Sequence, residues 1–259
     1  MKKTKQHTFA TLIKEFEYRY PLRSVFDDFL TLTTCACSQN PVTGLSHDED
    51  LYLATIKPYK DDPLRHHFPK MFASLTCEMQ HRVDSGMGND VLGEFYEQNL
   101  YRKGASQYFT PWPICSFMAK ACTDTIDAYA TREPLRILDP CCGSGRMLLA
   151  SAKENGPDHE YYGIDIDNTC VKMTAINMFL NGMFHSEVMC GDALCPDDFR
   201  GSYKTSFLPF GIFRTAEKEQ SYLYMLHKNS FQNMKPAGEK PELVFQGKSI
   251  GKATQLKLF

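Results

Sequence analysis

Leu-Arg-Ile-Leu-Asp-Pro-Cys-Cys-Gly-Ser-Gly, residues 135–145, is the stretch that decides the fold. A short and mostly apolar run ends at a carboxylate, Asp139, and two glycines follow at Gly143 and Gly145. Apolar residues return at positions 147–149, where we expect a helix to begin. Glycines permit positive φ angles and close approach of the backbone, and a helix start offers unpaired N–H groups. The stretch therefore predicts a strand, a tight turn and a helix that together bind a nucleotide-like ligand.

Details of this turn favour one kind of nucleotide. A dinucleotide fingerprint needs a third glycine so that helix and strand pack closely, and that position holds Leu148. The turn also lacks the lysine of a phosphate-binding P-loop. The carboxylate of Asp139, four residues before the first glycine, suits a ligand that carries positive charge. S-adenosylmethionine has sulfonium and ammonium groups and fits this description, which leaves a dinucleotide-dependent dehydrogenase as a remote alternative.

Composition sets wider limits. The chain has 259 residues and a net charge of −2, so it has enough apolar content for a core but no global basic field for wrapping nucleic acid. The ten cysteines include no C-x-x-C pair, and neither they nor the eight histidines show paired spacing for zinc, so we expect no metal. No secretory signal and no apolar run of about 18 residues is found. These features favour reduced thiols in a cytoplasmic protein without a membrane segment.

The first part of the chain, residues 1–103, is predicted to be a mainly helical region. Aromatic and aliphatic residues recur at helical spacing between Phe9 and Leu30, with an interruption at Pro21. Further helices are expected over residues 50–56, 63–82 and 91–100, and Asp90 is a plausible N-cap for the last of them.

The second part, residues 104–247, alternates strand and helix patterns. After the strand that ends at Asp139, strands are expected over 161–165 and 187–190, with a helix after each of the first two. These strands are also followed by acids, Asp165 and Asp192. A fourth strand is expected over 203–207, a helix over 217–234 and a fifth strand over 243–246, before a flexible tail, 248–259. The pattern predicts an α/β fold with a doubly wound parallel sheet, whose ligand sites lie at the carboxyl edge.

Four segments stand in an order that identifies a family. They read Gln-Tyr-Phe-Thr-Pro at 107–111, Asp-Pro-Cys-Cys-Gly-Ser-Gly at 139–145, Gly-Ile-Asp-Ile-Asp at 163–167 and Gly-Asp-Ala-Leu at 191–194. They resemble the cofactor motifs of N6-adenine DNA methyltransferases, and are closest to the modification (M) subunit of type I restriction–modification systems. The resemblance implies a Rossmann-like methyltransferase domain, truncated at its end, behind a helical N-terminal region. It also implies S-adenosyl-L-methionine as cofactor, DNA as partner and a restriction–modification partner subunit.

The resemblance gives roles to individual residues. Phe109 and Thr110 would cradle the methionine end of the cofactor. Asp165 would accept hydrogen bonds from both ribose hydroxyls, Ile166 would pack on the adenine, and Asp192 would accept from its exocyclic amine. The full predicted cofactor set is Gln107, Tyr108, Phe109, Thr110, Asp139, Pro140, Cys141, Gly143, Gly145, Asp165, Ile166, Asp192 and Ala193.

The chain departs from the family at the catalytic motif. Family members carry Asn/Asp-Pro-Pro-Tyr/Phe just after the fourth strand, where an amide or carboxylate oxygen orients the target amine and the aromatic ring stacks on the flipped base. At the corresponding place this chain reads Phe-Leu-Pro-Phe, residues 207–210, so Pro209 and Phe210 match and the acceptor is absent. The expected function is therefore S-adenosylmethionine binding near DNA with poor or no methyl transfer.

The C-terminal peptide adds a second hypothesis. Gln255, Leu256, Leu258 and Phe259 resemble the short peptide by which bacterial replication and repair proteins dock on the sliding clamp. Two alternatives therefore stand beside the main interpretation. One is an active site-specific adenine-N6 methyltransferase that uses an unusual acceptor or a partner subunit, and the other is a non-catalytic, clamp-tethered regulatory or decoy module.

Overall fold

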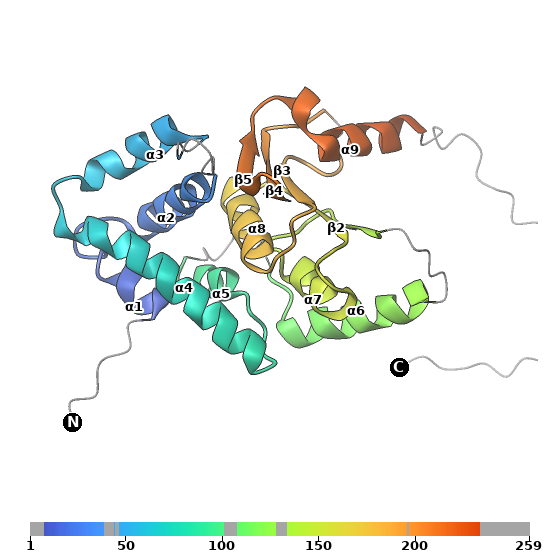
Figure 1. Ribbon diagram of the computed structural model, residues 1–259, viewed down its shortest axis with the longest axis horizontal. Coiled ribbons are helices and arrows are strands. Elements are labelled where there is room, and N and C mark those ends of the chain that lie inside the picture. The colour runs from blue at the N-terminus through green and yellow to red at the C-terminus, as the bar shows by residue number, and fades with distance from the viewer. Residues whose placement is uncertain are drawn as a thin grey trace, which may run out of the picture.

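The computed structural model describes residues 8–38, 44, 47–100, 108–127, 134–195 and 197–233 (Figure 1). A helical part, drawn in blue and cyan, lies against a part that contains a single sheet. The expected α/β fold with a helical N-terminal region is confirmed. The predicted fifth strand at 243–246 and the C-terminal peptide lie outside the described residues. None of the helices in the described part is long and apolar enough to cross a membrane.

In the described residues up to 100, five α-helices and two 3-10 turns build the helical part. The helices are α1 (Phe9–Lys14), α2 (Leu22–Ala36), α3 (Glu49–Ile56), α4 (His67–Asp84) and α5 (Val91–Asn99), and the turns are η1 (Lys57–Tyr59) and η2 (Pro63–His66). The side chains of Thr8 and Asp90 cap α1 and α5 by accepting from backbone N–H groups. Aromatic rings fill the centre, where Phe9 lies 5.1 Å from Phe29 and 5.3 Å from Phe95 between ring centroids. These contacts bring α1, α2 and α5 into one core.

The sheet has the order β1-β2-β3-β4-β5. Its strands are β1 (Arg136–Asp139), β2 (Glu160–Asp165), β3 (Ser186–Cys190), β4 (Gly201–Phe207) and β5 (Phe210–Thr215). The first three pair in parallel, and β4 and β5 form an antiparallel hairpin on the outer side of β3. The predicted fourth strand is therefore present, but its direction is reversed and β5 was not expected. A strand's direction depends on its pairing partner, which a local pattern does not encode.

Helices cover both faces of the sheet. On one face lie α7 (Arg146–Asn155) and α8 (Asn168–Leu180), with α6 (Trp112–Asp127) packed beside α7 (Figure 1). On the other face α9 (Tyr222–Asn233), which follows the turn η3 (Lys218–Gln220), packs Leu223 and Tyr224 against Tyr162 and Ile164. Helix α8 lies between the sheet and the helical part, and eleven of its residues, from Thr169 to Phe179, are buried. Because the helix is enclosed, its polar side chains find partners on other elements: Lys172 donates to Thr31 of α2, and Asn177 donates to Asp90.

Candidate functional site

The turn between β1 and α7 can be made only with glycines. Gly143 has a φ of +56° and Gly145 a φ of +81°, in the left-handed region that other residues avoid. A Cβ on Gly143 would lie 3.2 Å from the Phe109 ring, and one on Gly145 would lie 2.9 Å from Cγ2 of Thr174. The missing side chains therefore let the turn fit between the 108–110 segment and α8.

Three acids come together at one edge of the sheet. Asp139 and Asp165 are the last residues of β1 and β2, and Asp192 follows β3 by two residues. Because these strands are parallel, their carboxyl ends lie at the same edge. Burial raises the pKa of the Cys141 thiol, and the negative charges of Asp139, Asp165 and Asp192 raise it further. Hydrogen bonds connect the three strand ends: Gly143 N–H donates to the Asp165 carboxylate at 2.9 Å, and Gly191 N–H, next to Asp192, donates to the Asp165 carbonyl at 3.0 Å.

Two of these carboxylates are partly deprived of water. Burial raises the pKa of both Asp139 and Asp165 above the ordinary carboxyl value, although backbone hydrogen bonds lower each in part. Asp165 accepts from the N–H groups of Gly143 at 2.9 Å and Asp167 at 2.8 Å, and Asp139 accepts from Cys141 N–H at 3.0 Å. Each carboxylate oxygen can accept more than one hydrogen bond, so acceptor capacity remains for a ligand. A cationic ligand would stabilise such poorly solvated negative charge.

Exposed surface surrounds the acids. The side chains of Pro140 and Cys141 are exposed, and Ile166 is 63% exposed directly after Asp165. Ile166 also lines a cavity of about 560 Å³ between the ends of β2 and β3 and the hairpin. Ala193, beside Asp192, is half-buried, and its carbonyl accepts from the ring of His227 at 2.8 Å. The cavity is lined by Asp167 and by none of the three acids, so what this edge offers next to Asp165 is the exposed apolar side chain of Ile166.

The 108–110 segment reaches the glycine turn from outside the sheet. Phe109 is 6% exposed and packs over Gly143, whereas Tyr108 is 84% exposed. The Thr110 carbonyl accepts from Nη1 of Arg146 at 3.0 Å. Gln107 lies outside the described residues. The structure thus brings Phe109 and Thr110 beside the turn.

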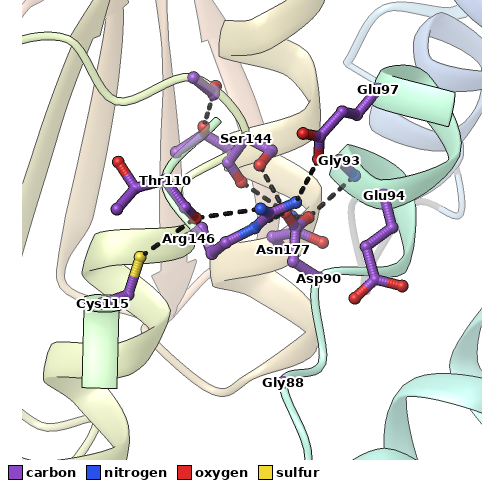
Figure 2. A network of polar contacts seen from close by, with 12 residues as sticks. Gly88, Asp90, Gly93, Glu94, Glu97, Thr110, Cys115, Ser144, Arg146 and Asn177 are labelled. Atoms are coloured by element: carbon purple, nitrogen blue, oxygen red, sulfur yellow. Dashed lines mark hydrogen bonds and ion pairs between the residues drawn. The ribbon is translucent and has the colours of Figure 1, made fainter. Parts of the chain in front are cut away.

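A buried polar network that the sequence analysis missed holds this arrangement (Figure 2). Asp90, expected only as a helix cap, also accepts from Ser144, Arg146 and Asn177. One signal was present in the sequence, because Arg146 begins α7, where the helix dipole disfavours a cation. An arginine at that place requires a buried acid, and Asp90 supplies it.

The segment aligned with the catalytic motif lies elsewhere, which corrects that expectation. Residues 207–210 form the turn between β4 and β5, with a cis peptide before Pro209. Strand β4 runs antiparallel to β3, with Cys190 opposite Gly201 and Ser186 opposite Thr205, so this turn lies at the amino edge of β3. There Phe210 packs 5.5 Å from Phe184 between ring centroids. Pro209 and Phe210 are thus at the opposite edge from the three acids.

Comparisons with known proteins place these features in context. A family model described as N-6 DNA methylase matches residues 87–230. This range includes the Asp90 network, the glycine turn and all three acids.

Two curated relatives are similar over part of their length. A type II methyltransferase, M.MamI of Microbacterium ammoniaphilum, is 28% identical over 151 residues, which cover 51% of this chain and 41% of that protein. A release factor glutamine methyltransferase of Thermodesulfovibrio yellowstonii is 29% identical over 106 residues, which cover 41% and 37%. The chain therefore spans less than half the length of these relatives.

Two solved structures have a related arrangement. One is a putative class I S-adenosylmethionine-dependent methyltransferase from Listeria monocytogenes, with a TM-score of 0.42 and 13% identity over 72% of this chain and 53% of that one. The other is the methyltransferase subunit of a type I restriction-modification system from Streptococcus thermophilus, with a TM-score of 0.36 and 14% identity over 86% and 69%.

Proposed function

The chain belongs to the N-6 DNA methylase family, whose methyl donor is S-adenosylmethionine, and we propose that the carboxyl edge of β1, β2 and β3 binds this cofactor. The observation that carries the proposal is that Asp139, Asp165 and Asp192 follow or end three adjacent parallel strands at one edge of the sheet, beside a turn with two glycines at positive φ. The donor set fits the cofactor, because partly buried carboxylates favour a sulfonium and an ammonium group.

Each part of the site has a separate task in this proposal. Asp165 accepts hydrogen bonds from the ribose hydroxyls, Ile166 covers one face of the adenine, and Asp192 accepts from the exocyclic amine. Phe109 and Thr110, in the 108–110 segment, contact the methionine end of the cofactor above the glycine turn. When bound, the cofactor supplies an electrophilic methyl group on its sulfonium. The exposed Ile166 supports this assignment, because an apolar side chain open to solvent beside Asp165 gains stability when a base covers it.

The proposal for methyl transfer is negative. No Asn-Pro-Pro or Asp-Pro-Pro occurs in the chain, and the Phe-Leu-Pro-Phe turn lies at the opposite edge of the sheet. We therefore propose a DNA-associated, cofactor-binding protein that transfers methyl groups to adenine poorly or not at all when alone. Loss of one preorganised hydrogen-bonding group from such a site lowers the rate by about a hundredfold or more. An active enzyme that is completed by a restriction–modification partner subunit is the alternative.

Two measurements test these statements in order. Calorimetry with S-adenosylmethionine should give saturable binding at one site, and failure to bind would reject the proposed function. A tritiated-methyl assay on adenine-containing DNA should then give little or no transfer. Robust transfer by the purified protein would establish the active enzyme, and transfer only after addition of a modification partner would establish the alternative.

The sliding-clamp hypothesis concerns Gln255, Leu256, Leu258 and Phe259, which lie outside the described residues. We keep it as a separate proposal that rests on the sequence alone. Pull-down with a bacterial sliding clamp should succeed with the full chain and fail after deletion of residues 255–259. Retention that is unaffected by the deletion would reject it.

A further inference from the structure

The carboxylate of Asp90 joins three parts of the molecule. Asp90 is 1% exposed and is the N-cap of α5, the last helix of the helical part. Oδ1 accepts from Gly93 N–H and from the side-chain amide of Asn177 on α8, both at 2.9 Å. Oδ2 accepts from the Ser144 hydroxyl at 2.6 Å and from Nε of Arg146 at 2.8 Å. One carboxylate thus fixes α5, α8 and the glycine turn together (Figure 2).

Arg146 extends this network to the 108–110 segment. While its Nε donates to Asp90, its Nη1 donates to the Thr110 carbonyl at 3.0 Å. The guanidinium carbon lies 5.8 Å from the centre of the Phe109 ring. Nη2 lies 3.5 Å from a carboxylate oxygen of Glu97, at the outer end of α5. The planar, forked shape of arginine allows all these contacts from one side chain.

Stability alone explains this pair poorly. A buried ion pair loses hydration that its attraction only partly offsets, and an apolar pair of similar size is often equally stable. Arg146 also places positive charge at the helix end where the dipole is positive. What the pair does provide is direction, because it fixes the Thr110 carbonyl and the Phe109 ring relative to Gly143.

We propose that Asp90, acting through Arg146, is a positioning residue for the methionine end of the cofactor site. The inference rests on the proposed function and names the part of the ligand that depends on the network. The adenosine end relies on Asp165, Ile166 and Asp192, which belong to the ends of β2 and β3. Because Asp90 caps α5 and Glu97 lies on it, affinity for the methionine end also depends on the docking of the helical part.

The experiment uses two ligands that differ at one end. S-adenosylmethionine carries the amino-acid group and the sulfonium charge, whereas 5′-methylthioadenosine keeps the adenosine and the methylthio group but lacks both. The comparison of each variant with the unmodified protein is therefore made for each ligand separately. Asp90→Asn retains the size of the side chain and removes its charge. Calorimetry should show about tenfold weaker binding of S-adenosylmethionine, as expected for one charged hydrogen bond, and an affinity for 5′-methylthioadenosine within about twofold of the unmodified protein.

A matched control loosens another tether of the helical part. Asp27 on α2 accepts from Thr169 at 3.0 Å and pairs with Lys172 at 3.5 Å, both on α8. Asp27→Asn should bind both ligands with affinities within about twofold of those of the unmodified protein, because the Asp27 side chain does not contact the glycine turn or the 108–110 segment. A second test variant, Arg146→Lys, keeps the charge and loses the fork that reaches Thr110, so it should reproduce the selective loss.

The outcomes separate this inference from the proposed function. If the unmodified protein binds neither ligand, the proposed function fails and this inference fails with it. If it binds both, and folded Asp90→Asn or Arg146→Lys binds S-adenosylmethionine normally, only the inference is rejected. If a variant binds both ligands more weakly by the same factor, the inference is also rejected, and Asp90 has a general structural role. If Asp90→Asn does not fold, Arg146→Lys decides the question by the same ratio of affinities.

Discussion

The two edges of the sheet differ in what they hold, although both carry segments that resemble family motifs. At the carboxyl edge, Asp139, Asp165 and the glycine turn come together as the sequence predicted, and both carboxylates accept from N–H groups of the turn. At the amino edge, the Phe-Leu-Pro-Phe turn packs on Phe184 and faces away from those acids. A motif that contains its own strand, turn and helix start determines its local geometry. A motif of four residues between two strands depends on the direction of those strands, which long-range pairing decides.

The largest expected effect is at the carboxyl edge. Asp165→Ala should weaken S-adenosylmethionine binding about a hundredfold, because two hydrogen bonds to a charged acceptor are lost, each worth about 1.5 kcal/mol or more. Calorimetry measures this change, and thermal unfolding tests whether the turn survives without the bond to Gly143.

Asp167→Ala is the control for removing a carboxylate from this loop. Asp167 caps α8 by accepting from Thr169 N–H at 2.9 Å. Its loss should lower stability by about 1 kcal/mol while the affinity changes by less than about threefold. Equal losses of affinity in the two variants would show that Asp165 acts only as a loop cap.

A crossed pair of variants compares the two edges directly. Ile166→Ala should weaken cofactor binding about fivefold and leave the melting temperature unchanged, because its side chain is 63% exposed. Phe210→Ala should lower the free energy of unfolding by about 1–2 kcal/mol, since the ring packs 5.0 Å from Phe179, and should leave the affinity unchanged. Weaker cofactor binding by Phe210→Ala would show that the turn between β4 and β5 contributes to the cofactor site.

The smallest expected effect is a dependence on pH. Burial raises the pKa of Asp139 and Asp165, so the folded protein holds these protons more tightly than the unfolded chain. Their contribution to stability is therefore greatest below the ordinary carboxyl pKa of 3.8 and is lost as pH rises through the raised values. A cationic ligand favours the ionised forms, so cofactor affinity should fall a few-fold as pH is lowered into that window.

Calorimetry in two buffers with different ionisation enthalpies checks this prediction. Binding in the acidic window should release protons, and binding at neutral pH should release none from these carboxyls. The Asp165→Ala variant should release fewer protons than the unmodified protein. Equal proton release by the two proteins would assign the effect to another group.

Sequence patterns predicted those parts of the fold that depend on neighbouring residues. The strand ending at Asp139, the glycine turn and the cap at Asp90 follow from local geometry. The antiparallel β4 and β5 hairpin could not be read in the same way, because an isolated strand has no direction relative to the sheet. The expected parallel pairing of three strands did correctly predict that Asp139, Asp165 and Asp192 lie at one edge of the sheet.

The buried network shows a second limit. Asp90 and Arg146 are 56 positions apart, and their contact at 2.8 Å depends on how α5 docks against α7 and α8. The local pattern gave Asp90 only its bond to Gly93. The partner of a buried charge can lie anywhere in the sequence, because the tertiary structure brings the two together. The one local sign of such a partner was an arginine, Arg146, at the start of α7.

Strand β1 has a consequence for handling the protein. Among the described strands it pairs only with β2, so the peptide groups on its outer side must bond to water or to another extended chain. Within this strand, Leu138 is 50% exposed and lines an apolar cavity of about 430 Å³ with Leu223 and Leu226 of α9. An exposed strand edge of this kind is a template for β-sheet extension. Concentrated preparations of the protein should therefore self-associate through β1.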